Sequence, residues 1–202
     1  MKRRCLLALP ALAIAAAPPA RGQAPGAIVR TRVGTPFGAF VIAVDPARAP
    51  VTVANYLAYV DNKWLDGGSV YRIVTLANQS ADTRYKIEVV QWGMNLPEDK
   101  APPLPPIVHE TTQQTGLRHL DGTVSMARST PGSAAGEFFI CIGDQPELDF
   151  GGRRNPDGQG FAAFGQVVSG QAVVRAIHQR GQPEQFLRNP IPVRRVRRAS
   201  AI

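Results

Sequence analysis

Glycine and proline recur along this chain and limit the length of any regular element. The 202 residues include 19 glycines and 18 prolines, and both residue types are unfavourable inside helices. The sequence therefore favours short strands and turns over long helices. With 44% apolar and 19% charged residues the chain has the composition of a globular protein, and its length suits one domain.

Short apolar runs bounded by turn residues predict strands, and two segments have helical periodicity. The helices are expected at residues 47–60 and 171–179, where apolar residues recur at spacings of three and four. Because the two helices lie far apart, the chain lacks regular βαβ alternation. We predict an all-β-dominated fold, a closed eight-stranded antiparallel barrel capped by two α-helices. The eight expected strands are residues 27–30, 39–44, 69–76, 85–92, 122–127, 137–142, 161–168 and 191–198.

The first 24 residues have the pattern of a secretory signal peptide. Three basic residues at positions 2–4 precede an apolar run over residues 5–17, and small residues and prolines follow. The run is too short to span a membrane. We expect cleavage between residues 17 and 24, a mature domain of residues 25–202, and a periplasmic or secreted protein without stable membrane insertion. An uncleaved anchor is the alternative.

The charge of the mature chain argues against a broad nucleic-acid interface. Residues 1–24 carry four basic and no acidic residues, so their removal lowers the net charge from +8 to +4. Four of the remaining arginines lie within residues 194–198, which leaves the rest of the chain close to neutral. Binding of this basic stretch to nucleic acid or an anionic membrane is the less favoured reading, because arginines on a terminal strand usually form a solvated face.

Several common catalytic signatures are absent from the sequence. It contains no Gly-Lys-Ser/Thr phosphate loop and no G-x-S-x-G nucleophile motif. His109, His119 and His178 lack the spacing of metal ligands and are predicted to lie at the surface or in loops. Without the signal segment Cys141 is alone, and its apolar surroundings indicate a buried core residue. We expect no metal and no cofactor.

Three stretches, in the same order along the chain as in the family, resemble the cyclophilin-type peptidyl-prolyl cis-trans isomerases. The chain is similar to a divergent, exported bacterial member of that family. They are TPFGAFVIAVDPARAPVTVANYLAYV (35–60), GTVSMARSTPGSAAGEFFICIGDQPELDF (122–150) and FAAFGQVVSGQAVVRAI (161–177). The similarity runs from about residue 30 to 198. It implies an eight-stranded antiparallel barrel with two capping helices, which agrees with the independent strand count.

The resemblance also implies a chemistry that needs none of the missing groups. Rotation of an X–Pro amide crosses a barrier of roughly 18–20 kcal/mol without making or breaking a bond. An enzyme has only to stabilise the twisted amide, for example with a cation that donates to its nitrogen. We expect a peptidyl-prolyl cis-trans isomerase that assists folding of exported proteins. Its partners would be proline-containing peptides or unfolded segments, with no nucleic acid, and it would be a monomer. The alternative is a catalytically weak proline-peptide binding module or chaperone on the same fold.

The family's site residues carry over onto five positions of this sequence. Arg72, in the stretch SVYRIV, matches the catalytic arginine. Met126 and Phe139 match the apolar floor of the proline pocket. Leu148 matches a wall leucine, and Phe161 matches an aromatic or histidine wall position. Simple core packing is the alternative for each of these apolar residues, and for Met126 in particular, because such a residue often does both.

Other positions depart from the family's pattern around the same groove. Val70 and Tyr71 stand where the family has Phe-His, so an aromatic wall is thinner and a histidine is replaced. Gln91 is retained and could hold the substrate carbonyl or steady Arg72. Arg128 stands where the family has an asparagine or arginine whose backbone lines the peptide groove.

Glu137 stands where the family has glutamine, and we expect it to face the groove. A carboxylate close to Arg72 would pair with it. Such a pair could fix the guanidinium in place or occupy donors that the amide nitrogen needs. Between Arg72 and Gln91 lie 18 residues, more than the family has. We expect the additional residues, 76–86, to extend a hairpin beside the groove that selects substrates or covers the site.

Overall fold

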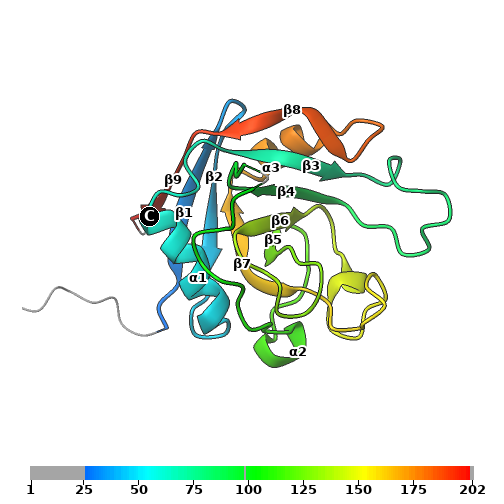
Figure 1. The fold of residues 1–202 in the computed structure, drawn as a ribbon, viewed down its shortest axis with the longest axis horizontal. Helices are drawn as coiled ribbons and strands as arrows, with labels where there is room; N and C mark the ends of the chain where they lie inside the picture. The colour runs from blue at the N-terminus through cyan, green and yellow to red at the C-terminus, as the bar shows by residue number, and fades with distance from the viewer. Residues whose placement is uncertain (1–25, 98, 201–202) are drawn as a thin grey trace, which may run out of the picture.

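The computed structural model describes residues 26–97 and 99–200, and the expected signal segment, residues 1–24, lies outside them. Nine antiparallel strands form one sheet in the order β8-β3-β4-β6-β5-β7-β2-β1-β9, which curls into a nearly closed barrel (Figure 1). The strands are β1 (Val29–Thr35), β2 (Gly38–Val44), β3 (Gly68–Val74), β4 (Val89–Gly93), β5 (Thr123–Met126), β6 (Glu137–Cys141), β7 (Ala162–Ser169), β8 (Phe186–Val193) and β9 (Arg195–Ala199).

The barrel closes through one bent segment of chain at its C-terminal end. Strands β8 and β9 are separated only by Arg194, yet β8 pairs with β3 and β9 pairs with β1 at the opposite end of the strand order. At the bend, the backbone N–H of Arg194 donates to the carbonyl of Gly34 at 2.8 Å. The sequence predicted a single strand over 191–198, and the structure has two. The residues before 191 were not predicted as strand because they include Pro190, which an edge strand such as β8 tolerates.

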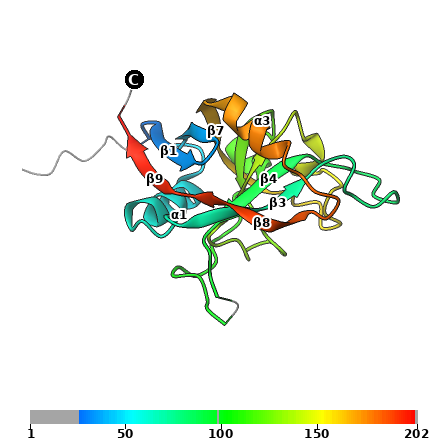
Figure 2. The ribbon, with the colours of Figure 1, turned by 90° about the horizontal axis from the view of Figure 1, so that it is seen from above.

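Two helices cover the barrel, as the sequence predicts. Helix α1 (Pro50–Asp61) and helix α3 (Gln171–His178) lie on opposite sides of it (Figure 2). A short helix α2 (Thr112–Thr115) and a 3-10 turn η1 (Pro146–Leu148) occur in the connections. None of the helices in the described part of the chain has the length and apolar character needed to cross a membrane.

The inner face of the sheet is filled by aromatic side chains centred on Phe138. Its ring lies 5.2 Å from Tyr56 and 6.2 Å from Tyr59 of α1, measured between ring centroids. It also lies 5.4 Å from Trp92 of β4 and 6.0 Å from Phe164 of β7. Edge-to-face and tilted contacts of this kind add to the gain from burying apolar surface. Phe138 therefore joins α1 to three strands.

Residues 76–86 do not extend the pairing of β3 with β4, and the described residues between these two antiparallel strands are an irregular loop. We call residues 75–88 the β3–β4 loop. The side-chain amide of Gln79 donates to the carbonyl of Ile87 at 2.8 Å and accepts from its N–H at 3.1 Å. This side chain satisfies the backbone groups that a partner strand would otherwise bond. Strands β3 and β4 therefore form a hairpin with this loop as its tip, but β3 ends at Val74 and β4 begins at Val89, short of the predicted residues 76 and 85, because the Gln79 side chain rather than a partner strand bonds Ile87.

The position of Phe138 predicts a large loss of stability when its ring is removed. We expect Phe138→Ala to lower the free energy of unfolding by about 3–5 kcal/mol, because the ring is fully buried and its loss leaves a cavity. Chemical denaturation measures the change. The control Val108→Ala alters an exposed residue and should stay within about 0.5 kcal/mol. Equal effects of the two substitutions would contradict the described core.

Candidate active site

The candidate site is built on the outer face of three neighbouring strands. Arg72 of β3 lies opposite Gln91 of β4, and Gln91 lies opposite Phe139 of β6. Directly paired residues point to the same face of a sheet, and successive residues point to opposite faces. Phe139 therefore faces outward while Phe138 fills the core. This alternation brings a cation, an amide and an aromatic ring into one row on the outside of the barrel.

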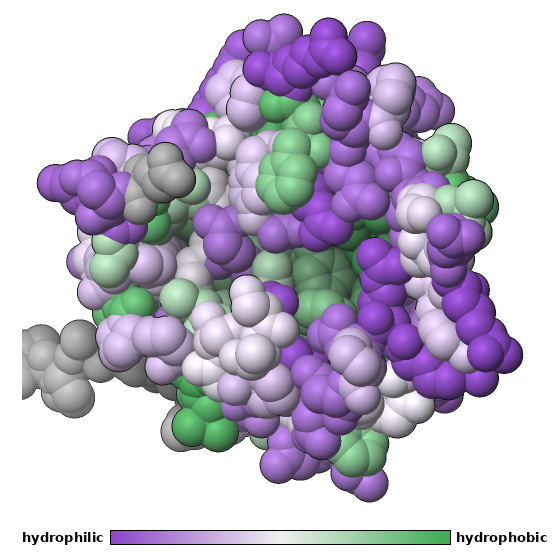
Figure 3. Space-filling view, turned by 45° about the vertical axis from the view of Figure 1, so that its right-hand side comes forward, coloured by the Kyte–Doolittle hydropathy of each residue, from purple (hydrophilic) through white to green (hydrophobic). Residues whose placement is uncertain are grey.

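A cavity of about 190 Å³ lies over this row. Figure 3, which looks onto this side of the molecule, shows a hollow with an apolar floor and a hydrophilic rim. Six of the ten predicted site residues line the cavity: Arg72, Gln91, Arg128, Phe139, Leu148 and Phe161. Ile87 and Val89, which were not predicted, also line it and form part of its apolar wall.

A bulge in β3 directs two consecutive side chains towards the site. The pairing of β3 with β4 shifts register between Val70 and Arg72, so that Tyr71 has no opposite residue on β4. In a regular strand Tyr71 and Arg72 would point to opposite faces. A bulge re-aims side chains locally, and here both residues interact with Gln91.

The guanidinium of Arg72 is held by two glutamine side chains. Its Nη1 donates to Gln91 Oε1 at 2.9 Å, and its Nε and Nη2 donate to Gln185 Oε1 at 3.1 and 2.6 Å. The ring of Phe186 lies 5.6 Å from the guanidinium carbon. A guanidinium carries five N–H donors, and these bonds use three. Arg72 is thus fixed in position with two donors left over.

The support from Gln185 was not predicted from the sequence. Gln185 precedes β8, far from Arg72 in the chain, and only the pairing of β8 with β3 brings the two together. Its amide nitrogen donates to the carbonyl of Asn78 in the β3–β4 loop at 3.2 Å. The loop therefore helps to orient the amide that holds the arginine.

The expected ion pair between Glu137 and Arg72 is not formed. The carboxylate of Glu137 accepts a hydrogen bond from the hydroxyl of Tyr71 instead. Glu137 lies opposite Gly93, two residues along β4 from Gln91, and its carboxylate occupies the space above that glycine. A side chain at Gly93 would displace it. The register of β4 and β6 thus places Glu137 beside Tyr71, next to the cavity over Phe139 and facing an adjoining hollow of about 370 Å³.

The buried position of Glu137 makes its carboxyl group a weaker acid than that of an exposed glutamate. Burial raises its pKa to about 7, and the hydrogen bond from Tyr71 opposes this only in part. Burial and the neighbouring Glu137 also raise the pKa of Tyr71, so the tyrosine stays protonated. Gln91 Nε2 donates to the same tyrosine hydroxyl at 2.5 Å. Glu137, Tyr71, Gln91 and Arg72 therefore form one hydrogen-bonded chain.

Two predicted site residues, Met126 and Val70, lie inside the barrel and do not line the cavity. Met126 is opposite Phe138 and is 1% exposed, and Val70 is opposite Trp92 and is 2% exposed. Both belong to the main core. Their assignment to the pocket was wrong because strand alternation turns them to the inner face, and Ile87 supplies apolar surface to the cavity instead.

His119 lies in a loop, as predicted, but it is buried beneath the cavity floor rather than exposed at the surface. Its ring lies parallel to that of Phe139, with centroids 5.9 Å apart. Its two ring nitrogens lie 2.8 Å from Asp149 Oδ1 and 2.9 Å from Ser125 Oγ. The three groups are arranged like a Ser-His-Asp triad, but Ser125 has no exposed surface for a substrate to reach. This network fixes the ring that forms the floor.

Cys141 is also buried, as predicted.

Arg128 forms one rim of the cavity, and its charge is balanced. Its Nη1 and Nη2 donate to the two carboxylate oxygens of Asp157 at 2.8 and 3.0 Å. The guanidinium lies over the ring of Phe161, with its carbon 5.1 Å from the centroid. Bidentate pairing and stacking together hold both side chains at the rim.

Comparison with known proteins identifies this arrangement. Residues 28–198 match the family described as cyclophilin type peptidyl-prolyl cis-trans isomerase/CLD. The chain belongs to the cyclophilin family. It is a peptidyl-prolyl cis-trans isomerase, as the sequence predicts.

Bacterial relatives agree with this assignment, and solved structures agree with the fold. The chain is 35% identical to a peptidyl-prolyl cis-trans isomerase of Streptomyces antibioticus over 72% of its own length and 80% of the relative. It is 34% identical to peptidyl-prolyl cis-trans isomerase A of Dickeya dadantii, over 72% of this chain and 68% of that one. A cyclophilin structure from Cryptosporidium parvum superimposes with a TM-score of 0.69 over 87% of this chain and all of its own, at 14% identity. A second structure of that protein, in the presence of the dipeptide Ala-Pro, gives a TM-score of 0.68 at 15% identity over 85% of this chain and 99% of its own.

The raised pKa of Glu137 predicts that the stability of this cyclophilin depends on pH. Its pKa in the folded state, about 7, exceeds that of an unfolded chain, so its contribution is fully present below the unfolded pKa and is lost as the pH rises through 7. Relative to wild type, Glu137→Gln should gain roughly 1–3 kcal/mol of unfolding free energy between pH 4.5 and 8. Urea denaturation across this pH range measures the difference.

The matched control is Glu184→Gln, which alters an exposed glutamate. Its stability difference from wild type should stay nearly constant across the same pH range. If Glu137→Gln gave an equally flat difference, Glu137 would have an ordinary pKa and would not be buried against Tyr71 as described.

Proposed function

We propose that this cyclophilin isomerises X–Pro bonds of exported, unfolded proteins with Arg72 as its catalytic residue. One observation carries the proposal: a guanidinium fixed by Gln91 and Gln185 borders an apolar cavity floored by Phe139. The cavity provides a site for a proline ring, and the arginine provides donors beside it.

The cavity favours proline because its apolar residues gather on one side. Phe139, Leu148 and Phe161 line it together with Val89, and burying an apolar ring against them is favourable. The related cyclophilin studied in the presence of Ala-Pro supports the same class of ligand. A proline ring seated on this floor places its amide near Arg72.

Arg72 would act by stabilising the twisted amide. In a planar amide the nitrogen lone pair is delocalised into the carbonyl, and in the twisted state it becomes available as an acceptor. A donor aimed at that nitrogen stabilises the twisted state more than either planar isomer, which lowers the barrier. Burial lowers the pKa of Arg72, but an arginine remains charged at neutral pH.

Gln91 acts on Arg72 in this proposal rather than on the substrate. Its side-chain oxygen accepts from Arg72, and its nitrogen donates to Tyr71. Because Tyr71 donates to Glu137, each group in the chain has a fixed direction of hydrogen bonding. The network holds the guanidinium without a carboxylate partner and leaves two donors for the amide. This feature favours catalysis over the alternative of a binding module with weak activity.

We expect Arg72→Ala to lower kcat/KM by about 100-fold or more, the usual effect of removing one donor to a transition state. Exchange spectroscopy of a proline peptide measures the rate directly, and titration of the same peptide measures binding. Gln185→Ala keeps the guanidinium but removes its support, so it should fall between wild type and Arg72→Ala.

Arg188→Ala serves as the control, because this arginine on β8 is exposed and pairs only with Glu184. It should keep the wild-type rate. If wild type and Arg72→Ala are equally slow while both bind the peptide, the chain is a binding module and the catalytic assignment is refuted.

We further propose that the chain works outside the cytoplasm as a monomer that assists folding. The signal-like pattern of residues 1–24 supports export.

Nucleic acid is not among its proposed partners. Two of the C-terminal arginines are paired with aspartates at and just after the end of α1, Arg197 with Asp66 at 2.5 Å and Arg198 with Asp61 at 2.7 Å. These ion pairs reduce the free positive charge of that stretch.

Expression in a Gram-negative host tests export. The protein recovered from the periplasm should begin between residues 18 and 25, because cleavage is expected between residues 17 and 24. Mass spectrometry of the intact protein gives the first residue, and the same chain lacking residues 1–24 should remain in the cytoplasm. A full-length chain retained in the cytoplasm would contradict the proposal.

A further inference from the structure

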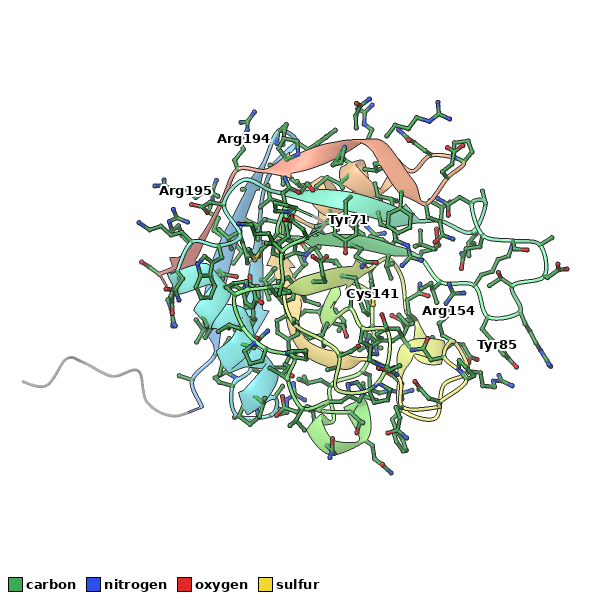
Figure 4. All side chains as sticks on the ribbon, in the orientation of Figure 1. Tyr71, Tyr85, Cys141, Arg154, Arg194 and Arg195 are labelled. Carbon is green, nitrogen blue, oxygen red and sulfur yellow. The ribbon has the colours of Figure 1, made fainter. Side chains whose placement is uncertain are left out.

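Arg154 lines the cavity over Phe139 in which we place the substrate's proline ring, called the proline cavity from here on. The function described so far does not use Arg154. It lies in the segment between η1 and β7, and its half-buried side chain contributes to the same cavity as Arg72 and Phe139. Figure 4 shows Arg154 nearer the centre of the molecule than Tyr85, on the same side. With Arg128 included, the cavity therefore has arginines from three separate parts of the chain.

Two loops hold Arg154 in place. Its Nη1 donates to the carbonyl of Tyr85 in the β3–β4 loop at 3.0 Å, and its backbone N–H donates to the carbonyl of Glu147 at 3.1 Å. The preceding Arg153 packs over the ring of Tyr85, with its guanidinium carbon 4.3 Å from the centroid. Arg153 also pairs with the carboxylate of Glu147 at 3.0 Å. Arg154 is thus fixed in a position at the edge of the cavity.

The charge of Arg154 is not balanced by the protein. Of the three arginines that line the cavity, Arg128 pairs with Asp157, whereas neither Arg72 nor Arg154 forms an ion pair with any residue that the structure describes. Burial lowers the pKa of Arg154, and burial together with the charge of Arg154 lowers the pKa of Arg72. Glu137 does not pair with either arginine, because its carboxyl group accepts a hydrogen bond from Tyr71 and lines the adjoining hollow. The proline cavity therefore has two uncompensated positive charges.

We propose that Arg154 makes this cavity selective for a carboxylate next to the proline. The carboxylate is either an acidic side chain adjacent to the proline or the chain terminus of a C-terminal proline. An anion between Arg72 and Arg154 relieves their repulsion and gains charge-assisted hydrogen bonds. The proline ring occupies the apolar floor at the same time. The inference rests on the isomerase function and adds a substrate preference to it.

Matched peptides that differ only beside the proline test the proposal. One set has Glu, Gln or Lys before the proline, and a second set has them after it. A third pair ends in proline, with a free carboxylate or an amide. Titration calorimetry gives each dissociation constant, and exchange spectroscopy gives each isomerisation rate. The variants are Arg154→Gln and, as the matched control, Arg188→Gln, which removes a largely exposed arginine outside the cavity lining.

For wild type, we expect the carboxylate form to bind roughly three- to tenfold more tightly than its neutral counterpart in at least one set. Lys should bind more weakly than Gln in that set, and high salt should reduce the preference. Arg154→Gln should reduce the ratio between carboxylate and neutral forms to near one, while Arg188→Gln should keep the wild-type ratio.

Three results would overturn the proposal. They are equal binding of carboxylate and neutral peptides by wild type in all three sets, an unchanged preference in Arg154→Gln, and an equal loss of preference in Arg188→Gln. Absence of isomerisation of the neutral Gln peptide by wild type would instead count against the proposed catalysis. The binding ratios are measured independently of turnover, so the two failures can be told apart.

Discussion

The two-residue alternation of the barrel strands is the constraint on which the site depends. Each strand under the cavity supplies one residue to the core and the next to the outer face, so Phe138 holds the barrel together while Phe139 forms the cavity floor. A shift of one residue in β6 would exchange the two rings and destroy core and site together. The stability of the fold and the geometry of the site therefore have the same origin.

The exception to alternation lies in β3, the strand that carries Arg72. The bulge in β3 lets Tyr71 and Arg72 reach the same amide of Gln91, from which hydrogen bonds extend to Glu137 on one side. Gln185 completes the support of the arginine from the other side. The arginine is held by neutral amides rather than by a carboxylate. Its charge and two of its donors are therefore available to a substrate.

The sequence predicted the architecture better than the site. Apolar periodicity and turn residues predicted the helices and most strands, because these signals are local. Family resemblance located Arg72, but it carried Met126 and Val70 into the pocket, although alternation turns both inward. Gln185 and Arg154 were missed because loops bring them to the site from distant parts of the chain. A single sequence does not show which loop residues meet across a barrel.

Nuclear magnetic resonance of the protein with a bound proline peptide tests the central claim most directly. The account predicts contacts from the proline ring protons to the ring of Phe139 and the methyl groups of Val89 and Leu148, which line the outer cavity. It predicts none to Met126, which lies in the core, and a shift of the Arg72 side-chain N–H signal on binding. Contacts elsewhere on the surface, with the Arg72 signal unmoved, would contradict the account.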